Sequence, residues 1–247
     1  MEEYREFIEL FVDVWHKGLR NPARTQAQTL EWLVEGYART IYGQQLDLMA
    51  LQEQSDDPDR FFEIYRRTFP VVTYDQIKPW IDRVVAGDAE ALLPEAPVAW
   101  AMTRGTTRGS TKRIPITETD LGIRVAAARG LLNHLLRTDQ LEAMEGYSLN
   151  LNYPSVVGTM DVAGQEMPYG FSSGIYVRHA AAATPVEILP PQEEIDALGG
   201  GNTPEAWKRR FDWVFERTKD APITLCAGVC PSILDFGHHL QRRHRQA

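Results

Sequence analysis

The sequence predicts an α/β protein in which a helical N-terminal subdomain precedes a mixed sheet with flanking helices. In the first third of the chain, apolar residues recur at the spacing of amphipathic helices, as in residues 2–15 and 25–42. From Val98 onward, short apolar runs typical of strands alternate with helical patterns. We therefore expect a helical subdomain over residues 1–93 and an α/β part over residues 94–247, which could also form one continuous domain.

Turn and capping residues divide the first part into four helices. Pro22 precedes the second helix, and a cluster of Ser, Asp and Pro at residues 55–59 precedes the third. Residues 70–74 are expected to be extended and to lead into the fourth. The expected helices are residues 2–15, 25–42, 60–67 and 74–87.

In the second part, strands and helices alternate. The run from Val98 to Met102 is typical of a buried strand, and Thr119-Asp120 is typical of the start of an amphipathic helix. Residues 164–177 are expected to form a loop that leads into either a helix or a strand. The other expected strands are residues 114–116, 147–151, 155–160 and 223–227, and the expected helices are residues 119–137, 204–218 and 231–244.

The composition excludes several classes of function. The net charge of −8 and the pI near 5.3 argue against a nucleic-acid or anionic-membrane partner, because phosphate backbones favour clustered Lys and Arg. No signal peptide is readable, and no apolar run approaches the roughly 18 to 20 residues that span a bilayer, so we expect a cytoplasmic protein. Cys226 and Cys230 lie in an apolar context that favours buried, reduced thiols, and no metal site is expected.

The ten residues that join the first two strands have an unusual composition. They read Thr-Arg-Gly-Thr-Thr-Arg-Gly-Ser-Thr-Lys from Thr103 to Lys112. Such a loop suits a polyphosphate, because glycines let backbone N–H groups turn toward phosphate oxygens while hydroxyls donate and cations offset charge. It is not a GxxxxGK[ST] loop, because Gly109 is followed by Ser110 rather than Lys. On composition alone, an exposed connection between two strands is the simpler interpretation.

Neighbouring segments favour the phosphate interpretation. The loop resembles the Ser-Ser-Gly-Thr-Ser-Gly-Gly-x-x-Lys motif of adenylate-forming enzymes, with the pattern carried by Gly105, Thr106, Gly109 and Lys112. Residues 69–84 look like the preceding segment in one branch of that firefly-luciferase-like superfamily, the auxin-responsive promoter family of acyl-acid amido synthetases. Further segments that look like this family are Thr40-Ile41-Tyr42-Gly43, Ser173-Gly174-Ile175 and residues 223–229. The chain thus resembles the N-terminal part of such an enzyme, the first part of its large adenylate-forming domain.

The resemblance implies a ligase that binds ATP and Mg²⁺. A small carboxylic acid attacks the α-phosphate to give an acyl-adenylate and pyrophosphate, and an amine, usually that of an amino acid, then takes the acyl group. The loop would hold the β and γ phosphates through donors and cations that are already in place. The positions that the resemblance assigns to this contact are Thr103, Gly105, Thr106, Thr107, Gly109 and Lys112. None of them would be a nucleophile or a general base, and no catalytic side chain is assigned.

The sequence departs from the family pattern in three ways. Arg104 replaces a small hydroxyl residue, and Arg108 stands where the family has glycine, which costs about 1–2 kcal/mol if that position needs a positive φ. The family's Tyr-Gly-x-x-Glu-like segment for adenine and metal is missing, since Tyr169-Gly170 is not followed by the acid. We expect either an N-terminal piece of a longer protein or a short paralogue, without synthetase turnover on its own.

Two alternatives remain from other classes of protein. The first is a non-catalytic nucleotide-binding or interaction module derived from the same domain. The second is a serine hydrolase, because residues 170–174 read Gly-Phe-Ser-Ser-Gly and match the G-x-S-x-G pattern. It would need a strand before Ser172, a helix after it, and either Asp196 or Asp212 together with His238.

Overall fold

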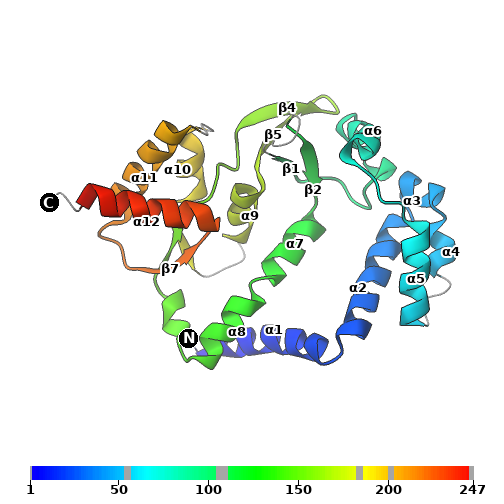
Figure 1. Cartoon of the computed structure of the whole chain (residues 1–247), viewed down its shortest axis with the longest axis horizontal. Coiled ribbons are helices and arrows are strands. Elements are labelled where there is room, and N and C mark those ends of the chain that lie inside the picture. Colours follow the sequence, from blue (N-terminus) through cyan, green and yellow to red (C-terminus); the bar gives the residue numbers. More distant parts are fainter. Residues whose placement is uncertain (1, 53–56, 104–110, 182–185, 200–202, 245–247) are drawn as a thin grey trace. The chain divides into compact units, whose positions relative to one another are not determined.

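The structure is a computed structural model that describes residues 2–52, 57–103, 111–181, 186–199 and 203–244 (Figure 1). The chain forms two compact units. Unit 1 comprises residues 1–98 and 161–166, and unit 2 comprises residues 99–160 and 167–247. None of the described helices combines the length and the apolar character that a membrane span requires.

Unit 1 is built from helices, and side chains cap the first turns of α2, α3 and α5. At the start of α2 the Asn21 side chain accepts a hydrogen bond from the N–H of Arg24. At the start of α5 the Asp57 carboxylate accepts from two backbone N–H groups. The helices are α1 (Glu2–Arg20), α2 (Pro22–Tyr37), α3 (Ile41–Gln45), α4 (Leu48–Gln52), α5 (Pro58–Thr68) and α6 (Tyr74–Val85), followed by a 3₁₀ turn, η1 (Ala89–Ala91).

The core of unit 1 lies among α2, α4 and α5. Val34 of α2, Leu51 of α4 and Phe61 of α5 are each almost completely buried and belong to one apolar cluster. Burying a side chain of this size stabilises the folded state by about 1.5–3 kcal/mol. α2, α4 and α5 therefore share one apolar core.

The predicted helix over residues 25–42 is two helices in the structure. α2 ends at Tyr37, and the Thr40 hydroxyl donates to the carbonyl of Tyr37 (2.7 Å) and accepts from the N–H of Gly43 (3.0 Å). A Cβ at position 43 would overlap the carbonyl group of Tyr37, so only glycine fits there. The Thr-x-Tyr-Gly segment is thus the capped start of α3.

The strands form two sheets. In the four-stranded sheet, of order β2-β1-β5-β4, the strand β1 pairs antiparallel with β2 and parallel with β5. In the three-stranded sheet, of order β6-β3-β7, the central strand β3 pairs parallel with both neighbours. The strands are β1 (Ala99–Met102), β2 (Arg113–Ile116), β3 (Tyr147–Asn150), β4 (Gly158–Val162), β5 (Gln165–Phe171), β6 (Glu187–Leu189) and β7 (Ile223–Ala227).

Helices pack against the sheets of unit 2 through two apolar clusters. One cluster joins β1, β2, α7 and α9 and contains Ala101, Ile116, Leu121 and Ile175. The other lies between α10, α11 and α12 and contains Leu151, Ile195, Phe211, Val214 and Phe236. The helices are α7 (Glu118–Ala126), α8 (Arg129–Arg137), α9 (Ser172–Ala180), α10 (Gln192–Ala197), α11 (Pro204–Thr218) and α12 (Cys230–His244), with a 3₁₀ turn, η2 (Leu141–Met144). The α/β class predicted from the sequence is confirmed.

Two predictions about local structure need correction or completion. The helix expected over residues 119–137 is interrupted, because the N–H groups of Ala127 and Ala128 bond to carbonyls three residues back and break the ladder between α7 and α8. The open choice over residues 164–177 resolves into both elements, since β5 runs directly into α9.

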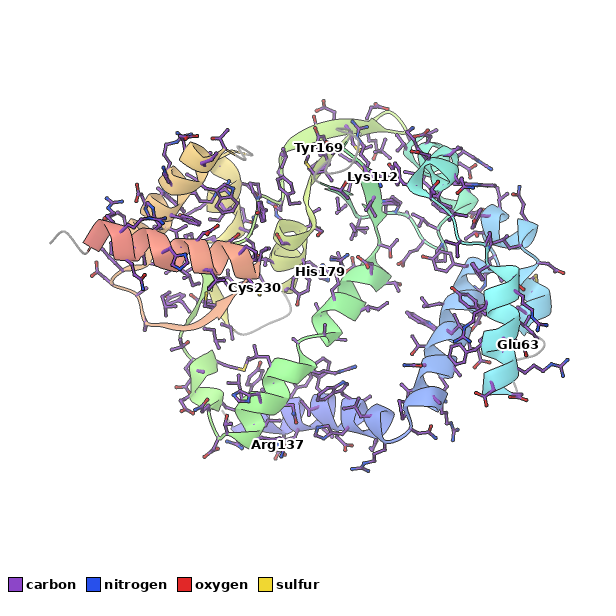
Figure 2. The ribbon with its side chains drawn as sticks, in the orientation of Figure 1. Glu63, Lys112, Arg137, Tyr169, His179 and Cys230 are labelled. Atoms are coloured by element: carbon purple, nitrogen blue, oxygen red, sulfur yellow. The ribbon has the colours of Figure 1, made fainter. Side chains whose placement is uncertain are left out.

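The prediction of two buried thiols is wrong. Cys226 in β7 and Cys230 at the start of α12 are both exposed free cysteines; Figure 2 labels Cys230. β7 is an edge strand of its sheet, so one of its sides is open. An apolar sequence context alone did not reveal that edge position.

Candidate functional site

The hairpin of β1 and β2 holds the two ends of the phosphate-loop segment together. The register pairs Met102 with Arg113, and the next pair outward is Thr103 with Lys112. The N–H of Thr103 donates to the carbonyl of Lys112 (3.0 Å), and the N–H of Lys112 donates to the Thr103 hydroxyl oxygen (3.3 Å). The segment therefore begins and ends at one point of the sheet.

Two of the six predicted phosphate contacts lie among the described residues. Thr103 is half-buried, and Lys112, labelled in Figure 2, is exposed next to the start of β2. The other four, together with Arg104 and Arg108, lie outside the described residues: Gly105, Thr106, Thr107 and Gly109. Their contact with phosphate remains a prediction.

The parallel pairing of β1 and β5 places a helix start beside this hairpin. Met102 lies opposite Phe171 in the register, so Thr103 and Ser172 follow their strands at the same edge of the sheet. α9 begins at Ser172, and the side chain of its N-cap residue, Phe171, makes no capping hydrogen bond. Ligand sites of α/β sheets are common at the carboxyl ends of strands.

The guanidinium of Arg113, the first residue of β2, makes a cation–π contact with an aromatic ring. The guanidinium of Arg113 lies over the ring of Tyr169, labelled in Figure 2, with 5.6 Å between the guanidinium carbon and the ring centroid. Tyr169 is on β5, and β1 lies between β5 and β2 in the sheet. Such a contact orients a cation at the same edge as Lys112.

A buried polar cluster, which sequence reasoning missed, fixes the loop after β3. The Asp196 carboxylate accepts from the backbone N–H of Ser155 (2.6 Å), from the Ser155 hydroxyl and from the Gln192 side chain (3.1 Å). The Asn150 amide donates to the Gln192 side chain (3.1 Å) and accepts from the N–H of Asn152 (3.1 Å). These residues, hereafter the Asp196 cluster, come from two separate parts of the sequence, residues 150–155 and 192–196, so no local motif indicates them.

The Asp196 cluster presses its loop against β5 and α9. A Cβ at position 170 would overlap the carbonyl group of Ser155, and a Cβ at position 174 would overlap that of Tyr153. The Ser173 hydroxyl accepts from the N–H of Tyr153 (3.3 Å). The two glycines and one serine of the Gly-Phe-Ser-Ser-Gly segment therefore serve close packing.

The geometry offers little to a hydrolase at Ser172. A strand precedes Ser172 and a helix follows it, as that alternative requires. However, a nucleophile elbow needs a strained turn, and Ser172 is not among the described non-glycine residues with positive φ. Asp212 bonds to Nε2 of His239 (2.6 Å) rather than to His238, which is exposed one residue earlier on α12. The other candidate acid, Asp196, accepts from Ser155 and Gln192, so among the described residues neither acid has the pairing with His238 that this alternative requires.

No metal-binding cluster of three or more His, Cys, Asp or Glu side chains occurs in the part of the chain that the structure describes.

The assignment of the chain to a known family comes from its sequence as a whole. The profile of the GH3 family N-terminal domain matches residues 13–195, which is well over half of the chain. The chain belongs to the GH3 family. This confirms the resemblance seen in residues 69–84 and in the loop.

Individual relatives of this GH3 chain are amide-forming synthetases by name. It is 30% identical over 103 residues to indole-3-acetic acid-amido synthetase GH3.2 of Arabidopsis thaliana, an alignment that covers 41% of the chain and 17% of the relative. It is 26% identical over 117 residues to jasmonoyl-L-amino acid synthetase JAR6 of Nicotiana attenuata, covering 47% of the chain and 18% of the relative. The alignments thus span less than a fifth of these relatives' length.

A solved structure of the GH3.15 acyl acid amido synthetase shares the fold. It matches with a TM-score of 0.60 at 20% identity, and the match covers 94% of this chain and 38% of that one. The fold of nearly the whole chain is therefore that of part of a GH3 protein.

Proposed function

We propose that this chain provides the ATP-phosphate loop of an ATP-dependent acyl-acid amido synthetase, an acid–amino acid ligase. The observation that carries the proposal is the hairpin closed by Thr103 and Lys112 at the carboxyl end of β1, in a chain of the GH3 family. The hairpin brings a hydroxyl and a lysine to the two ends of a Gly-, Thr- and Arg-rich segment.

The proposed reaction has two steps. A carboxylate oxygen of the acid forms a bond to the α-phosphorus of ATP, and the bond to the β-phosphate oxygen breaks to release pyrophosphate. The amine nitrogen of an amino acid then bonds to the acyl carbon, AMP leaves and the nitrogen loses a proton. Mg²⁺ bound with ATP would reduce the charge of the phosphates.

The residues of this chain act on binding and orientation in that scheme. Lys112 pairs with the β and γ phosphates, and the Thr103 hydroxyl and the loop N–H groups donate to their oxygens. Because Thr103 and Lys112 are held next to the ends of β1 and β2, these two residues need little reorganisation as charge develops on the leaving pyrophosphate. The expected effect is a lower barrier to adenylate formation.

Titration of ATP by calorimetry tests the site. We expect Lys112→Ala to weaken ATP binding about tenfold or more, because a charge-assisted contact to phosphate is lost. Lys219→Ala is the matched control, since Lys219 is an exposed lysine of unit 2 that pairs with Glu216. Equal ATP affinity in wild type and Lys112→Ala would remove the nucleotide proposal.

Pyrophosphate release separates the synthetase from the alternative, a nucleotide-binding or interaction module without turnover. The 247 residues lack the Tyr-Gly-x-x-Glu-like segment, so we expect ATP binding without pyrophosphate release from this chain alone. A longer form that contains that segment should release pyrophosphate with some carboxylic acid. A long form that binds ATP but releases none with any acid would favour the module.

A further inference from the structure

Helix α1 of unit 1, the first helix in Figure 1, is apolar on two sides, of which one is buried and one is exposed. Ile8 and Val12 are 0% and 3% exposed, so they mark the buried side. Phe7, Leu10 and Val14 are 61%, 71% and 59% exposed. At 3.6 residues per turn, these three side chains project roughly 130° around the helix from the buried pair. A helix that is apolar on two sides has room for two neighbours.

The three exposed side chains, hereafter the α1 stripe, have the spacing of a contact between helices. Phe7, Leu10 and Val14 are separated by intervals of three and four residues, as along the seam of two paired helices. The ring of Phe7 is held between two other rings, with centroids 6.4 Å from that of Tyr4 and 6.3 Å from that of Phe11. The stripe is therefore an ordered apolar surface that a second helix can cover.

Charged residues lie at both ends of the α1 stripe. Glu6 lies one turn before Leu10, and Lys17 lies one turn after Val14, so the face carries acid, apolar, apolar and base in that order. The Lys17 ammonium pairs with Asp13 within the helix at 2.7 Å. This pair is exposed, and an ammonium has three donors, so Lys17 can accept a second carboxylate.

This order of residues is complementary to its own reverse. In an antiparallel pair of α1 helices, Leu10 of each copy lies against the partner's Val14, and Glu6 lies next to the partner's Lys17. A parallel pair would place Glu6 next to the partner's Glu6 and Lys17 next to the partner's Lys17, which is repulsive. Charge complementarity thus favours a second copy of this chain, related by a two-fold axis, as the helix that covers the stripe.

We propose that two copies of this chain associate through their α1 helices in antiparallel orientation. The two α1 stripes form the centre of the contact, and two Glu6–Lys17 ion pairs flank it. Because each copy contributes one helix face, the contact lies at the low end of specific interface sizes, and we expect a dissociation constant on the order of 10 µM. The proposal rests on unit 1 and not on the proposed nucleotide site.

Sedimentation velocity over about 1–200 µM protein measures the association. Wild type should shift from monomer to dimer across this range, and Leu10→Gln should raise the dissociation constant at least tenfold because two buried leucines are lost from each dimer. Leu234→Gln is the matched control, since Leu234 of α12 is a similarly exposed leucine, and it should dimerise like wild type. A wild type that stays monomeric throughout would overturn the proposal, as would equal association of Leu10→Gln and wild type.

Exchange of the flanking charges tests the antiparallel orientation. Glu6→Lys alone and Lys17→Glu alone should each weaken dimerisation about threefold or more, because like charges then meet twice across the two-fold axis. An equimolar mixture of the two variants should form a heterodimer of about wild-type affinity, since every lysine then meets a glutamate of the partner. Mixing changes nothing within either chain, so a mixture that associates no better than its components would contradict this pairing.

The dimer and the nucleotide site are separable by experiment. Lys112→Ala should dimerise like wild type, even where it loses ATP. Dimerisation that depends on Lys112 would contradict the assignment of the contact to α1.

Discussion

The hairpin of β1 and β2 and the Asp196 cluster both hold chain segments together next to the end of a strand, but they are assembled from different kinds of residues. The hairpin holds together the two ends of the segment that follows β1, and the Asp196 cluster fixes the loop that follows β3. The hairpin does so with two residues at the ends of one continuous segment, Thr103 and Lys112, which bond to each other through the backbone. The Asp196 cluster does so with side chains from β3, α10 and the loop between β3 and β4, which meet only in the folded protein.

This difference explains why one region could be predicted from the sequence and the other could not. A function that lies in one continuous segment shows in its composition, as the Gly- and Thr-rich run does. A structural device assembled from distant residues shows nothing locally. Its only trace was the Gly-Phe-Ser-Ser-Gly segment, whose glycines face that loop.

The largest expected effect is at that contact. Gly174→Ala should destabilise the protein by about 3 kcal/mol or more, because the added methyl group would overlap the backbone of the loop at Tyr153 and Ser155, which cannot shift without breaking the Asp196 cluster. The measurement is urea denaturation monitored by tryptophan fluorescence. Gly122→Ala is the control, since nothing lies near its Cβ in α7, and it should be neutral or slightly stabilising. Equal urea midpoints for Gly174→Ala and Gly122→Ala would contradict the close contact between position 174 and the loop held by the Asp196 cluster.

A second, smaller effect is expected at the centre of the cluster. Asp196→Asn replaces an acceptor of several hydrogen bonds by an amide that points two N–H donors at other donors, so we expect a loss of about 2–4 kcal/mol. Hydrogen exchange at the Ser155 amide should accelerate together with the loss in urea midpoint. Glu205→Gln, at an exposed position of α11, is the matched control. Slow exchange at Ser155 in Asp196→Asn would show that the carboxylate does not fix this loop.

The smallest effect is expected at the ion pair between Glu194 of α10 and Arg217 of α11. The hydrogen bond from Arg217 lowers the pKa of Glu194 from its ordinary value of 4.5. Its stabilising contribution is therefore complete above pH 4.5 and disappears as the pH falls through the lowered pKa. Because the pair is largely exposed, Glu194→Gln should shift the urea midpoint at pH 7 by less than about 0.5 M.

The pH dependence of that shift is the sharper measurement. The difference in midpoint between wild type and Glu194→Gln should shrink as the pH falls below 4.5 and vanish once the pH is below the lowered pKa of Glu194. A difference that grows as the pH falls would contradict the assigned direction of the pKa shift.

The sequence predicted more of the fold than of its details. The helical first part, the strands β1 and β2 and the long helices α11 and α12 follow from apolar spacing, because each buries one continuous stripe or run. The break between α7 and α8 did not, since Ala127 and Ala128, at which it occurs, are good helix formers. The exposure of Cys226 also escaped, because edge position depends on strand order.

The candidate sites show the same division. Thr103 and Lys112 were identified from the sequence because the motif chemistry is contiguous there. A pocket of about 400 Å³ between α11 and α12 was not, although Trp207 and Phe211 were visible as an aromatic stripe of one helix. What turns that stripe into a pocket is the facing side of α12, the next helix along the chain, together with Tyr153, which lies much earlier in the sequence.

Amide chemical-shift mapping by NMR during titration with ATP tests the central claim most directly. The account predicts that ATP shifts the amides of residues 103–112 and those at the start of α9, and that these shifts are lost in Lys112→Ala. The amides around Trp207 and His239 should remain unchanged. Shifts confined to the pocket between α11 and α12, or none at all at millimolar ATP, would contradict the assignment of the hairpin as the phosphate site.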